Sequence, residues 1–107
     1  MLNGTYAVCR FGAVDVVPQW ALGGVGFTSV TRTDDELSIV CEETLVPADQ
    51  QRVEHGWRAF KLQGPIPFEQ TGVLSSLISP LAEAGVEIFA ISTFDTDYVL
   101  VKAAKLE

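Results

Sequence analysis

Residues 71–101 read TGVLSSLISPLAEAGVEIFAISTFDTDYVLV, and this stretch decides the fold that the sequence predicts. Its first half has leucine and isoleucine at helical spacing, and Thr71 can cap the first turn through its hydroxyl. Gly85 favours a left-handed stop of that helix. Two runs of β-branched and aromatic residues, 88–92 and 98–101, then predict two strands. Asp95-Thr96 between them indicates a turn, because Asp hydrogen-bonds its own backbone there.

Pro80 interrupts the predicted helix. Proline has no N–H to donate to the carbonyl of Ser76, and its ring crowds the preceding turn. Two interpretations remain open: the helix kinks at Pro80, or it restarts with Ser79 as its cap. In either case backbone groups near Ser75 and Ser76 are left without helical partners. These free backbone groups could serve a function. The alternative is that the kink only fits the helix to a twisted sheet.

The composition limits the classes of function. The chain has 107 residues, and 48% of them are hydrophobic. A chain of this length can bury a core without the help of disulfides or metal ions. Its net charge of −7 argues against nucleic-acid binding and against an anionic membrane surface, because both need clustered Lys and Arg. The apolar runs fall far short of the ~20 residues that a membrane span needs. The N-terminus lacks the features of a signal peptide, so we expect a cytoplasmic protein.

Few residues fit catalysis or metal binding. Cys9 and Cys41 lie in apolar, strand-like runs, which predicts two buried thiols that behave as small hydrophobic side chains. A disulfide between neighbouring strands is the alternative. His55 is the only histidine, lacks a paired nucleophile and is predicted to lie on the surface. No Cys/His spacing fits a metal site. We expect no cofactor, no metal and no enzymatic activity.

An internal repeat organises the rest of the chain. Residues 7–12 parallel residues 59–64, and residues 31–40 parallel residues 92–101, with Asp34 matching Asp95 and Glu36 matching Asp97. Each half reads strand, connection, strand, turn, strand, but only the second half has a full helix in its connection. Adding a helix and a strand to such a unit gives the ferredoxin-like βαββαβ sandwich. The further elements expected are strands at 6–11, 27–31, 37–41 and 57–62, a helical turn at 18–21, a short helix at 46–53 with Pro47 in its first turn, and a break at Gly56.

The segments GWRAFKLQGP, TGVLSSLISPLAEAGVEIFAISTFDTDYVLVK and TRTDDELSIVCEE resemble bacterial ACT-domain proteins related to the arginine-sensing CASTOR proteins of animals. The resemblance implies an α+β fold of two tandem ACT-like units, residues 1–56 and 57–107, each with an antiparallel sheet and helices on one face. The first unit has a reduced helix, and the second stops at Glu107, before the last helix and strand of a full unit. The resemblance also implies ligand binding and regulation rather than catalysis. The high hydrophobic content suggests that another subunit covers the free face of the sheet, so we expect a homodimer.

The ligand expected from this resemblance is a free amino acid or a similar small metabolite. In ACT modules it lies by the loop before the first helix, here residues 64–72. A carboxylate suits a helix N-terminus, where free N–H groups converge. An ammonium or a basic side chain needs carboxylates, and Phe94 can cover an apolar stem. The candidate ligand-binding residues are Gly72, Val73, Leu74, Ser75, Ser76, Leu77, Thr93, Phe94, Asp95 and Asp97.

Each of these residues also has an interpretation without a ligand. Asp95 is favoured in a turn for local hydrogen bonding alone. Asp97, Ser75 and Ser76 suit solvated surface positions, and so does Glu36, the repeat partner of Asp97. The alternative function is a structural or protein-interaction module with a vestigial pocket.

Overall fold

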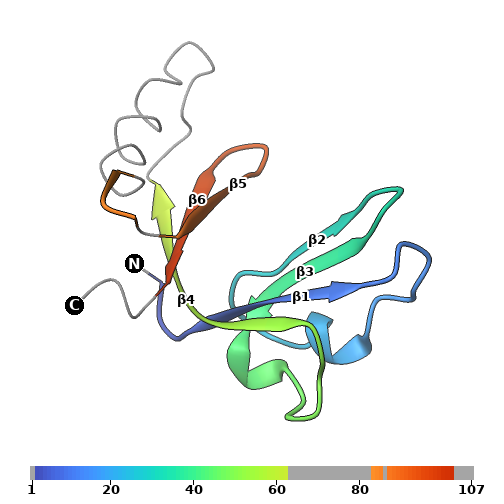
Figure 1. Ribbon diagram of the computed structural model, residues 1–107. Helices are drawn as coiled ribbons and strands as arrows, with labels where there is room; N and C mark the ends of the chain where they lie inside the picture. The colour runs from blue at the N-terminus through green and yellow to red at the C-terminus, as the bar shows by residue number, and fades with distance from the viewer. Residues whose placement is uncertain (1, 63–82, 86, 103–107) are drawn as a thin grey trace. The chain divides into compact units, whose positions relative to one another are not determined.

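The chain forms antiparallel strands joined by turns and short 3-10 helices, as shown by a computed structural model that describes residues 2–62, 83–85 and 87–102 (Figure 1). Two compact units are present, and each is described by itself. We call Gly4–Trp57 the N-terminal unit, and Met1–Asn3 with Arg58–Glu107 the C-terminal unit. The described elements are β1 (Tyr6–Phe11), η1 (Gln19–Leu22), β2 (Ser29–Arg32), β3 (Leu37–Glu42), η2 (Glu43–Leu45), β4 (Val53–Leu62), β5 (Ile88–Ser92) and β6 (Asp97–Lys102).

Strands in the N-terminal unit follow the order β2-β3-β1-β4, with every neighbour antiparallel. Cys9 lies opposite Ile39 and Ala7 lies opposite Cys41, so these four side chains share one face of the sheet. All four are 0% exposed, and their face is the core of the unit.

The connection between β1 and β2 covers this core face in place of a helix. Its one regular element is the 3-10 turn η1, as the sequence predicts, and η1 buries Ala21 completely. The Trp20 ring packs against that of Phe11, with centroids 6.3 Å apart. The core cluster consists of Ala21, Leu37, Ile39 and Cys41, with Phe11, Val17, Trp20, Leu45 and Val46 packed against it.

The predicted break at Gly56 is wrong, because the glycine lies inside β4. This strand begins at Val53 rather than at Trp57. Its register with β1 shifts between Tyr6–Trp57 and Val8–Glu54, so β4 carries one extra residue there. Gly56 has φ of 81°, which is the glycine conformation of a β-bulge. A bulge lets the strand continue past a glycine that local sequence reads as a stop.

The predicted helix over residues 46–53 is also wrong. Val46 is extended (φ −79°, ψ 126°), as expected for a residue before proline. Pro47 then starts a tight turn, in which its carbonyl accepts from the N–H of Gln50 at 3.1 Å. Arg52 has φ of 55° and leads directly into β4. The helical residues of this region come earlier, in η2.

The C-terminal unit contains the hairpin of β5 and β6, which pair from Ile88–Val101 to Ser92–Asp97. Leu2 joins this unit by donating its N–H to the carbonyl of Ala59 at 2.8 Å. Gly85 has φ of 78° and follows the helical residue Glu83, which confirms the predicted left-handed stop. The predicted helix from Thr71 to residue 82, including Pro80, lies outside the described residues.

Strand boundaries agree closely with the sequence where the local pattern is strong. β1 and β5 have the predicted ends. β3 extends one residue beyond the prediction, β6 extends one residue at each end, and β2 starts two residues late and ends one residue late.

Candidate ligand-binding site

The turn between β5 and β6 is held by the side chain of Thr93. Its N–H donates to the carbonyl of Thr96 at 2.8 Å, and its hydroxyl donates to the same carbonyl at 2.9 Å. The N–H of Thr96 donates back to Oγ1 of Thr93 at 3.2 Å. The sequence assigned this role to Asp95, but the threonine closes the turn. The hydroxyl of Thr93 is therefore already used within the hairpin.

Three further predicted residues lie on the same hairpin. Asp97 faces Ser92 across the strands, and the Ser92 hydroxyl donates to Oδ1 of Asp97. Phe94 projects from the turn with its side chain fully exposed. Asp95 beside it is exposed and, among the described residues, makes no hydrogen bond or ion pair. The hairpin tip thus presents an aromatic ring next to an unneutralised carboxylate.

The turn between β2 and β3 repeats this arrangement. The N–H of Thr33 donates to the carbonyl of Glu36 at 2.8 Å, and the N–H of Glu36 donates to Oγ1 of Thr33 at 3.1 Å. Thr33 therefore corresponds to Thr93. The repeat proposed from the letters, which matches Asp34 with Asp95, is one residue out of step in the turns.

Strand burial agrees with the corrected correspondence. Ile39, Val40 and Cys41 are the buried run of β3, and Val99, Leu100 and Val101 are the buried run of β6. In this register Asp35 corresponds to Asp95, and Leu37 corresponds to Asp97. The predicted pairing of Glu36 with Asp97 is wrong, because matching the two turn-closing threonines makes Glu36 correspond to Thr96.

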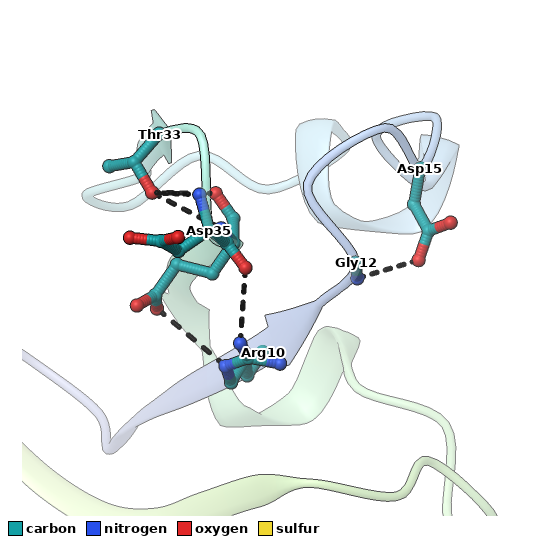
Figure 2. A network of polar contacts seen from close by, with 6 residues as sticks. Arg10, Gly12, Asp15, Thr33 and Asp35 are labelled. Carbon is teal, nitrogen blue, oxygen red and sulfur yellow. Dashed lines mark hydrogen bonds and ion pairs between the residues drawn. The ribbon is translucent and has the colours of Figure 1, made fainter.

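Glu36 is not simply solvated, because its carboxylate lies 4.0 Å from Nε of Arg10. Nη2 of the same arginine donates to the carbonyl of Asp35 at 3.2 Å. Figure 2 shows these contacts on one side of β1, together with the bond from the N–H of Gly12 to Oδ2 of Asp15 at 2.7 Å. Arg10 therefore anchors the β2–β3 turn to the strand beside it.

The polar contacts of the glycine-rich loop at residues 23–26 were not predicted from the sequence. The N–H of Gly26 donates to Oε1 of Glu42 at 2.7 Å, and the N–H of Phe27 donates to Oη of Tyr6 at 3.1 Å. The spacing of Gly23, Gly24 and Gly26 in the sequence is the signal for such a close approach. These amide groups donate to side chains of the same unit, so their hydrogen bonds stabilise the loop itself.

Arg58 is a second residue that the sequence did not single out. It lies on β4 in the C-terminal unit, and its Nε is buried without a hydrogen-bond partner among the described residues. Its Nη2 donates to the carbonyl of Leu2 at 3.4 Å. A charged residue inside the apolar run GWRAFKL is the sequence signal that could have found it.

The remaining predicted ligand contacts, residues 72–77, lie outside the described part of the chain. The described half of the candidate site can therefore supply carboxylates for a cation and an aromatic ring for an apolar group. Within residues 2–62, 83–85 and 87–102, no group of three or more His, Cys, Asp or Glu side chains is arranged to hold a metal ion. In the same residues no helix has the length and apolar character needed to cross a bilayer.

Comparison with known proteins places both parts of the chain. The family model of the ACT domain matches residues 52–107, and a model of an N-terminal domain matches residues 4–49. The crystal structure of protein Atu0741 from Agobacterium tumefaciens is 50% identical with a TM-score of 0.86, over 96% of this chain and 75% of that chain. The human protein CASTOR3P is 28% identical over 97 residues, which are 87% of this chain and 55% of that protein. The chain spans about half the length of this curated relative.

Proposed function

Because this chain belongs to the ACT-domain family, we propose that it is a regulatory protein that binds a small molecule, with a free amino acid as the ligand. It acts without catalysing a reaction, as a homodimer. Each chain of the dimer contains two related units. The hairpins of the two units support a duplication, because the same threonine-closed turn occurs in both.

The observation that carries the proposal is the acidic tip of the β5–β6 hairpin within the region matched by the ACT-domain model. Asp95 is exposed and makes no ion pair among the described residues. In Asp97 one carboxylate oxygen, Oδ1, accepts the hydrogen bond from the Ser92 hydroxyl. An amino acid's ammonium group requires such acceptors. Phe94, in the same turn, offers an apolar surface for the stem of the ligand.

The other end of the ligand needs donors for a carboxylate. The N–H groups of Gly72, Val73 and Leu74 are proposed for this role, with Ser75, Ser76 and Leu77 beside them, because the sequence predicts a helix start there and a helix start is suited to anions. Thr93 is proposed to position the turn, because its hydroxyl is used inside it.

The test is a thermal-shift screen of the full chain against the twenty amino acids. A ligand at 100 times its dissociation constant stabilises the folded protein by about 2.7 kcal/mol, which raises the melting temperature measurably. Asp95→Asn and Asp97→Asn are expected to weaken the response, since asparagine keeps an acceptor oxygen but removes the charge. Asp35→Asn is the matched control, because Asp35 holds the corresponding position in the other turn.

Two outcomes would count against this function. The absence of a shift with every amino acid at millimolar concentration would exclude amino-acid binding by the chain. A shift that Asp95→Asn and Asp97→Asn leave unchanged would place the site away from the hairpin.

A further inference from the structure

Asn3 is the single asparagine of the 107-residue chain, and Gly4 follows it directly. Asparagine before glycine is the pair most prone to spontaneous deamidation, because glycine has no Cβ to obstruct attack by its backbone nitrogen. Both residues are exposed, in a bend between Leu2 and Thr5. The sequence and the exposure together mark this pair as a candidate site of covalent modification.

The backbone nitrogen of Gly4 is free to react. Among the residues that the structure describes, its N–H donates to no acceptor, so no hydrogen bond has to break before the nitrogen attacks. Gly4 has φ of 82°, and a Cβ built on it would meet no atom within 4 Å. The space around the attacking nitrogen is therefore open.

The reaction at this pair needs no reagent except water. The Gly4 nitrogen attacks Cγ of Asn3, the bond from Cγ to Nδ2 breaks, and ammonia leaves with the proton of the Gly4 amide. The two groups are neighbours in the chain, which makes closure of the five-membered succinimide ring an intramolecular step. Water then opens the ring, at Cγ to give aspartate or at the main-chain carbonyl carbon to give isoaspartate. Either product adds one negative charge to a chain of net charge −7.

The main chain is anchored on both sides of the pair. The N–H of Leu2 donates to the carbonyl of Ala59 on β4 at 2.8 Å. The carbonyl of Leu2 accepts from Nη2 of Arg58 at 3.4 Å. On the other side, the carbonyl of Thr5 accepts from the N–H of Glu43 at 2.9 Å. In isoaspartate the main chain runs through Cγ and is one carbon atom longer between these anchors, which displaces Leu2 from the bonds that hold it.

We propose that Asn3–Gly4 is a self-modification site of the folded protein. Asn3 converts to isoaspartate and aspartate without an enzyme, and the isoaspartate form loosens Leu2 from β4. Because β4 lies within residues 52–107, which match the ACT-domain model, the change reaches the part of the chain in which the ligand site is proposed. The modification itself requires neither a ligand nor a second copy of the chain, so it goes beyond the proposed function.

Incubation of the full chain at mildly alkaline pH, followed by NMR, tests the site. Since Asn3 is the only asparagine, loss of the one asparagine side-chain amide reports the reaction, and charge-sensitive separation detects the added negative charge. The folded chain is expected to react at a rate close to that of the free peptide Leu-Asn-Gly-Thr. In the separated isoaspartate form, the Leu2 amide is expected to exchange its hydrogen with solvent faster than in the unmodified chain.

Three variants serve as matched controls. Asn3→Gln keeps an amide but would have to close a six-membered ring, and Gly4→Ala places a methyl group beside the attacking nitrogen, with room for it in the structure. Both are expected to retain their charge over the period in which the wild type changes. Asn3→Asp carries the charge of the product on a main chain of normal length, so its Leu2 amide is expected to exchange as slowly as that of the wild type.

Three results would overturn the proposal. A folded chain that keeps its asparagine while the free peptide loses it would show that the bend protects Asn3. An equal gain of charge by Asn3→Gln would assign the change to other residues. A Leu2 amide that exchanges no faster in the isoaspartate form than in Asn3→Asp would reject the loosening of Leu2. None of these results alters the amino-acid response in the thermal-shift screen, so failure of this site and failure of ligand binding are distinguishable.

Discussion

Gly26 and Glu42 are joined by a hydrogen bond from the glycine N–H to Oε1 of the carboxylate, 2.7 Å long. The approach is possible only without a side chain at Gly26. A Cβ there would lie less than 3.0 Å from Oε1 and Cδ of Glu42 and from Oη of Tyr6. The neighbouring Gly24 is under a similar constraint, with a Cβ position 2.7 Å from Cδ1 of Leu45. Neither residue has a positive φ, so the constraint is one of space, and it is stricter at Gly26, where the rigid Tyr6 ring carries one of the close atoms.

Gly26→Ala is therefore expected to destabilise the N-terminal unit by about 1 to 3 kcal/mol, the usual cost of forcing extra volume into a packed site. The free energy of unfolding in urea measures the loss. Gly23→Ala is the control, because its Cβ would have 3.9 Å to the nearest atom and its φ is −89°. Equal stability of the two variants would show that the loop moves away from Glu42 without cost.

The paired threonines make a second prediction. Thr33→Val and Thr93→Val keep the shape of the side chain but remove the hydroxyl that closes each turn. Each is expected to lower the free energy of unfolding by about 0.5 to 1.5 kcal/mol, the net value of a hydrogen bond in a protein. Thr33→Ser and Thr93→Ser retain the hydroxyl and should cost less. If valine were tolerated at either position, the backbone bond alone would be sufficient for that turn.

These turns also show how far the sequence determined the result. The strands Tyr6–Phe11 and Ile88–Ser92 were predicted with their observed ends because β-branched and aromatic residues recur along both of them. The register of the repeat was displaced by one residue because the acids Asp34 and Asp95 were aligned by identity. The hydrogen bonds that define the turns are made by Thr33 and Thr93. Which groups these threonines bond depends on the backbone geometry of the turn, which the amino-acid sequence alone does not show.

Longer-range pairing explains the remaining differences in the fold and site. Gly56 looked like a break because glycine weakens an isolated strand, but pairing with β1 carries β4 through it as a bulge. The acidic hairpin tip was found from its composition. That Ser92 would occupy one oxygen of Asp97 was not found, because it depends on which residues face each other across the strands.

The bulge at Gly56 gives a third prediction. Its φ of 81° is strained for any residue with a Cβ, although an added Cβ would meet no atom within 4 Å. Gly56→Ala is therefore expected to cost about 1 to 2 kcal/mol through the backbone alone. Gly56→Asn should cost less, because asparagine tolerates this conformation better than alanine does. Urea unfolding of the two variants compares them, and an alanine variant as stable as the wild type would mean that the bulge relaxes.

Cys9 and Cys41 give the fourth prediction, which concerns pH. Both thiols are free and 0% exposed, as the sequence predicts. Burial raises the pKa of the Cys41 thiol from 9.0 to about 11, with smaller contributions from Cys9 and Glu42, and burial also raises the pKa of Cys9. The unfolded chain therefore loses its thiol protons at lower pH than the folded chain does, so the free energy of unfolding must fall as the pH rises above 9.

For Cys41 the loss is at most about 1.4 kcal/mol for each pH unit between the two pKa values, and it is complete above the higher one. Chemical denaturation of the wild type from pH 8 to pH 11 measures the total slope. Cys41→Ala removes this contribution but leaves a small cavity, so it should be less stable at pH 8 and show a shallower dependence on pH. A variant with the slope of the wild type would mean that other groups cause the alkaline loss. Cys41→Ser is a poorer control, because it would leave a buried hydroxyl in need of a partner.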